Sequence, residues 1–127
     1  IKKATNNMNN KTQFLENNGV DVSAALSYMG DMETFDEIIK DFYDGLDQQL
    51  LEIEDYKNKG DMPNYAILVH ALKSNCRSLG ITEFADVAYQ HELKSKENDS
   101  EFVNEHFNDL IIAKEKWKQI IANYLSL

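Results

Sequence analysis

The sequence predicts an all-α protein, an antiparallel up-down-up-down four-helix bundle preceded by one or two short N-terminal helices. One proline and five glycines among 127 residues leave little turn chemistry for a β-sandwich or barrel, which needs a turn about every ten residues. Several stretches repeat apolar residues at spacings of three and four, as one helix face does. The 43% hydrophobic and 28% charged residues are typical of one globular domain.

The N-terminal part of the chain predicts only short elements. Residues 1–11 are rich in Asn and Lys without periodicity, so we expect a flexible lead-in or linker, with the domain over 12–127. Short helices are predicted over 12–17 and 22–29, since the second follows an aspartate cap and stops at a glycine. Because the chain starts with isoleucine, we expect it to be a domain of a longer protein.

Four long amphipathic helices should follow. The first runs from Asp31 to about Lys59, and the second from Asp61 to Leu79, with a proline in its first turn. The third covers 83–97, and the last follows 98–100 and ends near residue 124. Links of only a few residues leave no room for a parallel return, so consecutive helices should run antiparallel.

Charge and composition exclude several function classes. The formal charge of −9 would repel a polyanion, so nucleic acid is not an expected partner. No apolar run approaches the roughly 18 residues that a membrane span needs, so we expect a soluble protein.

The lone Cys76 cannot form an internal disulfide, which is compatible with a cytoplasmic location. The three histidines lack paired carboxylates at metal-ligand spacing, so no metal site is expected. Polar outer helix faces favour a monomer.

His70 lies outside the apolar stripe of the helix predicted over 61–79. At about 100° per residue, the apolar residues gather on an arc roughly opposite His70, namely Tyr65, Leu68, Val69, Leu72, Cys76 and Leu79. The residues that fall within about 60° of it are Ile67, Lys73, Ser74 and Arg77. We therefore expect the imidazole to stand in water, flanked by two cations.

The surroundings of His70 suit phosphoryl chemistry. From Met62 to Thr82 the chain has no Asp or Glu, so this segment is a basic island on an acidic protein. Positive neighbours favour a neutral imidazole, whose ring nitrogen is a nucleophile, and the same cations would stabilise a phosphoryl group placed on it. A surface histidine without function would show the same pattern, so the residues alone leave both interpretations open.

Residues 70–80, HALKSNCRSLG, resemble the signature of histidine-containing phosphotransfer (HPt) domains, H-x-L-K-G-x-x-x-x-L/I-G. The resemblance extends from Gly19 to about Leu125. Ser74 replaces the usual glycine of the signature, a change between small residues. His91 stands where the family generally has an apolar residue, and we expect it to be a core or semi-buried histidine with a local hydrogen bond.

The resemblance implies that His70 accepts a phosphoryl group at Nε2 from the aspartyl phosphate of a response-regulator receiver domain and passes it to another receiver. It implies no ATP binding and no cofactor, since the Mg²⁺ of the reaction belongs to the receiver. A hybrid sensor kinase, in the same or another chain, is a further expected partner. The residues expected to support the phosphoryl charge are Lys73 and Arg77, and those expected to bind the partner are Ile67, Ser74 and Gly80.

Two alternatives remain. The segment 91–96, HELKSK, resembles the H-E-L-K/R-S/T-P box of sensor histidine kinases, where His91 would carry the phosphate on a dimeric hairpin. Lys96 replaces the proline of that box, and His91 lies on an apolar stripe. The second alternative is a non-catalytic helical module whose basic island docks an acidic partner. We expect His106, at the edge of the last apolar stripe, to be structural.

Overall fold

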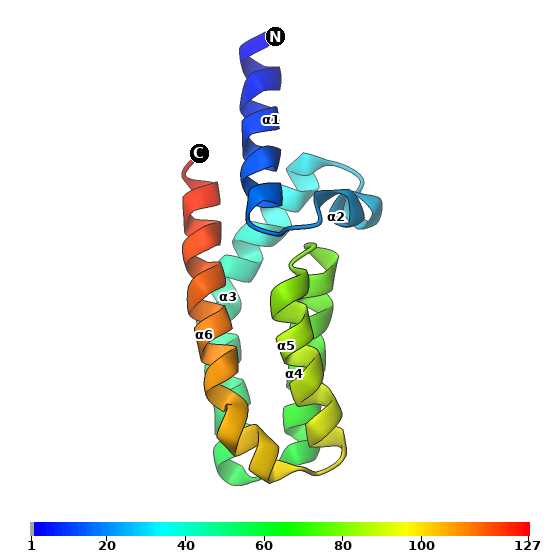
Figure 1. The fold of residues 1–127 in the computed structure, drawn as a ribbon, viewed down its shortest axis with the longest axis vertical. Coiled ribbons are helices and arrows are strands. Elements are labelled where there is room, and N and C mark those ends of the chain that lie inside the picture. The colour runs from blue at the N-terminus through cyan, green and yellow to red at the C-terminus, as the bar shows by residue number, and fades with distance from the viewer. Residues whose placement is uncertain (1) are drawn as a thin grey trace.

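The computed structural model describes the backbone from residue 2 to residue 127 and the side chains from residue 10 onward. Most of the lead-in predicted for 1–11 thus lies outside the described side chains, and its flexibility stays a prediction. The described chain forms six helices and no strand, which confirms the all-α class (Figure 1). They are α1 (Lys2–Asn17), α2 (Val22–Met29), α3 (Met32–Lys59), α4 (Met62–Ser78), α5 (Thr82–Lys96) and α6 (Ser100–Leu125).

Aspartates begin four of these helices. Each carboxylate accepts a hydrogen bond from a backbone N–H of the first turn, which would otherwise have no partner. The donors lie 2.8–3.2 Å away, and the capping residues are Asp21, Asp31, Asp61 and Asp99. Gly60 ends α3 in the left-handed conformation, with φ of 68°. The long helices therefore begin and end close to the predicted residues. The first short helix differs, because α1 begins at Lys2 and not at residue 12 as predicted.

The four long helices pack around one core. Each of the pairs α3–α4, α4–α5, α5–α6 and α3–α6 is in contact, and Figure 1 shows them lying along the long axis of the molecule. Helix α2 packs against α3 and α4, while α1 contacts α2 and α6. None of the helices described combines the length and the hydropathy that a membrane crossing requires. The largest fully buried side chains are Trp117, Tyr65, Tyr124, Phe35 and Phe84.

The turn between α4 and α5 is hydrogen-bonded to the connection between α1 and α2. Val20 and Ile81 form an isolated antiparallel bridge, and the backbone N–H of Asp21 donates to the Gly80 carbonyl at 2.8 Å. Gly80 is buried with φ of 73°, and a Cβ placed there would lie 2.3 Å from the Asp21 oxygen. The assignment of Gly80 to a partner surface is therefore wrong. Glycine is required there because the two turns pass too close for a side chain.

Candidate functional site

His70 projects from the exposed face of α4. The opposite face enters the core, where Val69, Leu72 and Cys76 are buried, as the helical angles predict. The His70 side chain is 56% exposed, and its Nδ1 atom lies 2.8 Å from Oε2 of Glu92 on α5. The prediction of a solvent-exposed imidazole on this helix is thus confirmed, but its nearest charged partner is a carboxylate.

Glu92 is the centre of the site. Its side chain is only 3% exposed, and three donors surround its carboxylate. Lys73 Nζ lies 2.5 Å from Oε1, while Lys96 Nζ, at 2.7 Å, shares Oε2 with the imidazole. Burial by itself would raise the Glu92 pKa, but the hydrogen bonds from Lys73, Lys96 and His70 outweigh it and lower the pKa to about 2. Glu92 is therefore ionised at neutral pH.

The ionised carboxylate fixes the tautomer of His70. A carboxylate without a proton can only accept hydrogen bonds, so Nδ1 of His70 must carry the hydrogen. In the neutral imidazole the lone pair then resides on Nε2, for which no hydrogen bond is found within the described chain. Glu92 thus orients the ring and leaves the other nitrogen as its nucleophilic atom.

Lys73, which was expected beside His70 on the exposed face of this helix, is buried instead. It is 7% exposed because its stem packs between α4 and α5 and its ammonium group reaches Glu92. Its Nζ also lies 5.1 Å from the ring centroid of Tyr89. Arg77 is exposed, as predicted, and its guanidinium lies 5.2 Å from the same ring. Two cations therefore lie over the Tyr89 ring on the C-terminal side of His70, of which Lys73 is buried and Arg77 is exposed.

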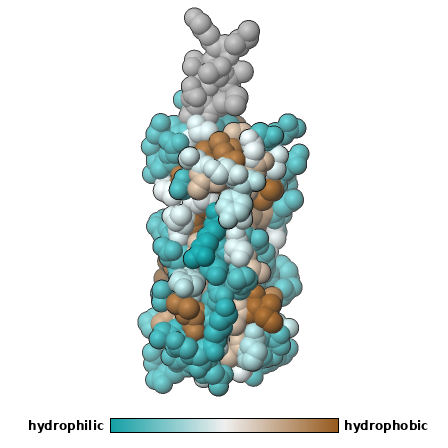
Figure 2. Space-filling model, turned by 90° about the vertical axis from the view of Figure 1, so that its right-hand side faces the viewer, coloured by the Kyte–Doolittle hydropathy of each residue, from teal (hydrophilic) through white to brown (hydrophobic). Residues whose placement is uncertain are grey.

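The surface beside His70 is partly apolar. Ile67 is 63% exposed and Ser74 is exposed on the same helix. A hollow of about 600 Å³ adjoins the histidine, lined by Pro63, Ala66, Ile67, His70, Ser95, Lys96 and Asn98. Figure 2 views the side of the molecule on which α4 and α5 lie, and shows a hydrophilic strip with hydrophobic patches on both flanks of its lower half. A protein that reaches His70 would meet both kinds of surface.

His91 belongs to the core, as expected. It is 1% exposed; the Tyr65 hydroxyl donates to its Nδ1 at 2.8 Å, and its Nε2 donates to the His106 carbonyl at 3.1 Å. Burial lowers the pKa of His91 to about 4, so the ring is neutral at neutral pH. With both nitrogens engaged and no access from solvent, His91 cannot act as the acceptor of the kinase box. The His106 ring itself is exposed and stacks on Phe102.

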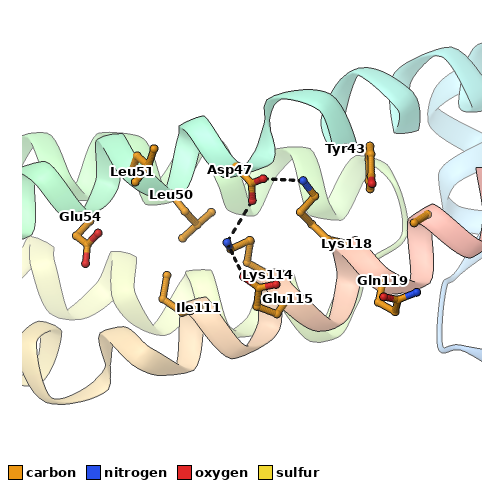
Figure 3. Close-up of a pocket in the computed structure, with 11 residues that line it drawn as sticks. Tyr43, Asp47, Leu50, Leu51, Glu54, Ile111, Lys114, Glu115, Lys118 and Gln119 are labelled. Atoms are coloured by element: carbon orange, nitrogen blue, oxygen red, sulfur yellow. Dashed lines mark hydrogen bonds and ion pairs between the residues drawn. The ribbon is translucent and has the colours of Figure 1, made fainter.

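A further groove between α3 and α6 contains no histidine. Asp47 on α3 pairs with Lys114 at 3.2 Å and with Lys118 at 2.8 Å, which ties the two helices together (Figure 3). Hydrogen bonds from Lys118 and Lys114 lower the pKa of Asp47. Because Asp47 pairs with both lysines across the two helices, we interpret this groove as a structural contact.

The sequence interpretation missed the roles of Glu92 and Lys96. Both residues lie in segments that resemble family motifs, but neither was assigned to the site of His70. A signal was available for Glu92, because it falls among the small residues Ala85, Ala88 and Ser95 on the buried side of α5. A carboxylate on a buried helix face needs a cation nearby, and a lysine from the preceding helix supplies it.

The family comparison agrees with this site. A family model, the Hpt domain, matches residues 37–123, which is more than half of the chain and includes the whole site. Searches of curated proteins and of solved structures found no match. Because this model covers more than half of the chain, the chain belongs to the Hpt domain family, whose members carry phosphoryl groups in two-component phosphorelays.

Proposed function

We propose that the chain is a phosphoryl carrier whose acceptor atom is Nε2 of His70. The donor is an aspartyl phosphate of a response-regulator receiver domain, and a second receiver takes the group onward. The unit that performs this is an antiparallel up-down-up-down bundle over residues 12–127. One observation carries the proposal: the imidazole, 56% exposed as a side chain, is oriented through Nδ1 by a buried, ionised Glu92, and its Nε2 has no hydrogen-bond partner within the described residues.

The phosphoryl transfer forms one bond to the imidazole and breaks one bond in the donor. The Nε2 lone pair forms a bond to phosphorus while the bond from phosphorus to the aspartyl oxygen breaks, and the donor carboxylate leaves with the electron pair. Nδ1 keeps its proton, so positive charge develops on the ring as the new bond forms. The Glu92 carboxylate, 2.8 Å away, stabilises that charge during the transfer. The reverse sequence of steps delivers the group to the next receiver.

The cations have different roles in this proposal. Lys96 is exposed and shares Oε2 of Glu92 with the imidazole, so its ammonium group is the cation best placed to offset a phosphoryl group on His70. Arg77 supports the partner's approach, while Lys73 acts through Glu92 by keeping it ionised. Ile67 and Ser74 contact the receiver, which contributes the Mg²⁺ of the reaction.

A transfer assay tests the proposal. Receiver domains encoded by the same genome are labelled with ³²P and mixed one by one with the wild-type chain. The His70→Gln variant should acquire no label, and the matched His106→Gln variant, which removes another exposed histidine, should acquire it as the wild type does. Label on the His70→Gln variant would show that another residue is the acceptor. Binding of receivers without any labelling would favour the non-catalytic docking module. The monomeric state and the cytoplasmic location stay predictions from the sequence.

A further inference from the structure

Tyr89 lies on α5, one turn before Glu92, and its ring faces two cations of the helix that carries His70. The Lys73 ammonium nitrogen lies 5.1 Å and the Arg77 guanidinium carbon 5.2 Å from the ring centroid. Tyr89 is 36% exposed, and its hydroxyl makes no hydrogen bond within the described residues. The contacts of this side chain with the acceptor site therefore run through the face of its ring.

The ring completes the surroundings of the buried Lys73 ammonium group. Lys73 is 7% exposed, and the one hydrogen-bond acceptor found for its Nζ among the described residues is Oε1 of Glu92, at 2.5 Å. An ammonium group carries three N–H donors, and its burial is unfavourable unless negative groups surround it. Because the face of an aromatic ring is negative, Tyr89 favours the orientation of Lys73 that points to Glu92.

Arg77 has no carboxylate of its own. No Asp or Glu within the described part of the chain forms an ion pair with its guanidinium, so the Tyr89 ring is its charged group's contact. Arg77 also follows Lys73 by four residues, a spacing at which like charges repel each other on a helix. A ring that attracts both cations offsets this repulsion and gives the flexible arginine one preferred place.

We propose that Tyr89 is a positioning residue of the acceptor site, an inference that rests on the proposed function. Its ring keeps the Lys73 ammonium on its carboxylate and the Arg77 guanidinium close by, so positive charge stands at fixed places when the phosphoryl group arrives. Charges that are already in place stabilise a developing charge without reorganisation. Tyr89 thus affects the transfer rate through the two cations, without touching the phosphoryl group.

A pair of substitutions separates the ring from the rest of the side chain. Tyr89→Leu keeps an apolar side chain but removes the ring, and it should lower the rate of labelling at saturating phosphorylated receiver about fivefold. Tyr89→Phe, the matched control, keeps the ring face and should stay within about twofold of the wild type. Circular dichroism verifies that both variants keep their helices. A loss in Tyr89→Phe as large as in Tyr89→Leu would assign the effect to the hydroxyl and overturn the inference.

A double-mutant cycle tests whether Tyr89 acts through the cations. In the Lys73→Met/Arg77→Gln background, Tyr89→Leu should slow labelling by less than about 1.5-fold, because the groups that the ring holds are absent. An undiminished fivefold loss in that background would mean that Tyr89 contacts the receiver directly or only supports the fold. Either explanation would overturn the inference.

Proton chemical shifts test the ring contacts without any receiver. The ring current should move the methylene protons next to the charged groups of Lys73 and Arg77 upfield in the wild type and in Tyr89→Phe. Tyr89→Leu should return these protons to ordinary shifts, and ordinary shifts in the wild type would overturn the inference. Failure of every receiver to label the wild-type chain instead overturns the proposed function, and the role of Tyr89 in transfer fails with it.

Discussion

Nδ1 of His70 and Oε2 of Glu92 lie 2.8 Å apart, and this contact joins an exposed ring to a buried carboxylate. The ring alone could rotate freely and exchange its proton between two nitrogens. Held by Glu92, it has one orientation and one available nitrogen. The carboxylate in turn depends on Lys73, so the chemistry at the surface is prepared by an ion pair between α4 and α5.

Replacing Glu92 by Gln should destabilise the fold and slow the transfer. The variant leaves the Lys73 ammonium buried without a counter-ion, which costs about 3 kcal/mol. The remaining amide can still accept from Nδ1, but it no longer offsets the positive charge of the ring, so we expect transfer to fall about tenfold, or roughly 1.4 kcal/mol. Urea unfolding and receiver labelling measure the two effects. Glu97→Gln, at an exposed neighbour, is the control and should change neither.

Replacing Lys73 by Met should be milder than replacing Glu92. The carboxylate keeps Lys96 and His70 as donors, and the methionine side chain fills the space of the lysine stem, so the expected loss of unfolding free energy is about 1 kcal/mol. Urea unfolding of both variants in the same buffer measures the difference. A loss as large as that of Glu92→Gln would show that Lys96 and His70 do not compensate for the missing ammonium group.

The buried His91 should make stability depend on pH between about 6.5 and 4. Its pKa is about 4 in the folded protein, below the ordinary value of 6.5. The unfolded chain therefore binds a proton that the folded chain excludes, and stability falls as the pH is lowered through this window, by up to about 3 kcal/mol. Urea unfolding at pH 7, 6, 5 and 4 measures this loss. In His91→Gln the same series should be flatter, and an equally steep series would assign the dependence to other groups.

Two glycines should respond oppositely to alanine. Gly80→Ala forces a Cβ against the Asp21 carbonyl at a positive φ, and it should cost at least about 2 kcal/mol. Gly45 lies inside α3 where a Cβ meets nothing within 4 Å, so Gly45→Ala should stabilise the protein by about 1 kcal/mol. Thermal unfolding of both variants measures the difference. A tolerated Gly80→Ala would mean that the two turns separate without cost.

The helices were predictable because their signals are local. Aspartate caps, Gly60 and the spacing of apolar residues act within a few positions, so the limits of α3 and α6 follow from the sequence. The exposed face that carries His70 follows from the same periodicity. The burial of Lys73 could not be predicted from this periodicity. Helical angles place Lys73 at the edge of the exposed face, and only the packing of α5 buries it. Gly80 likewise needed the distant turn at Asp21 for its explanation.

The most direct test of the central claim is the position of the phosphoryl group. The chain is labelled with ¹⁵N-histidine, phosphorylated by a phosphorylated receiver, and examined for coupling between ³¹P and ¹⁵N. The structure predicts coupling to Nε2 of His70, with Nδ1 still bearing its hydrogen toward Glu92. Coupling to Nδ1, or to a nitrogen of His91 or His106, would contradict the account.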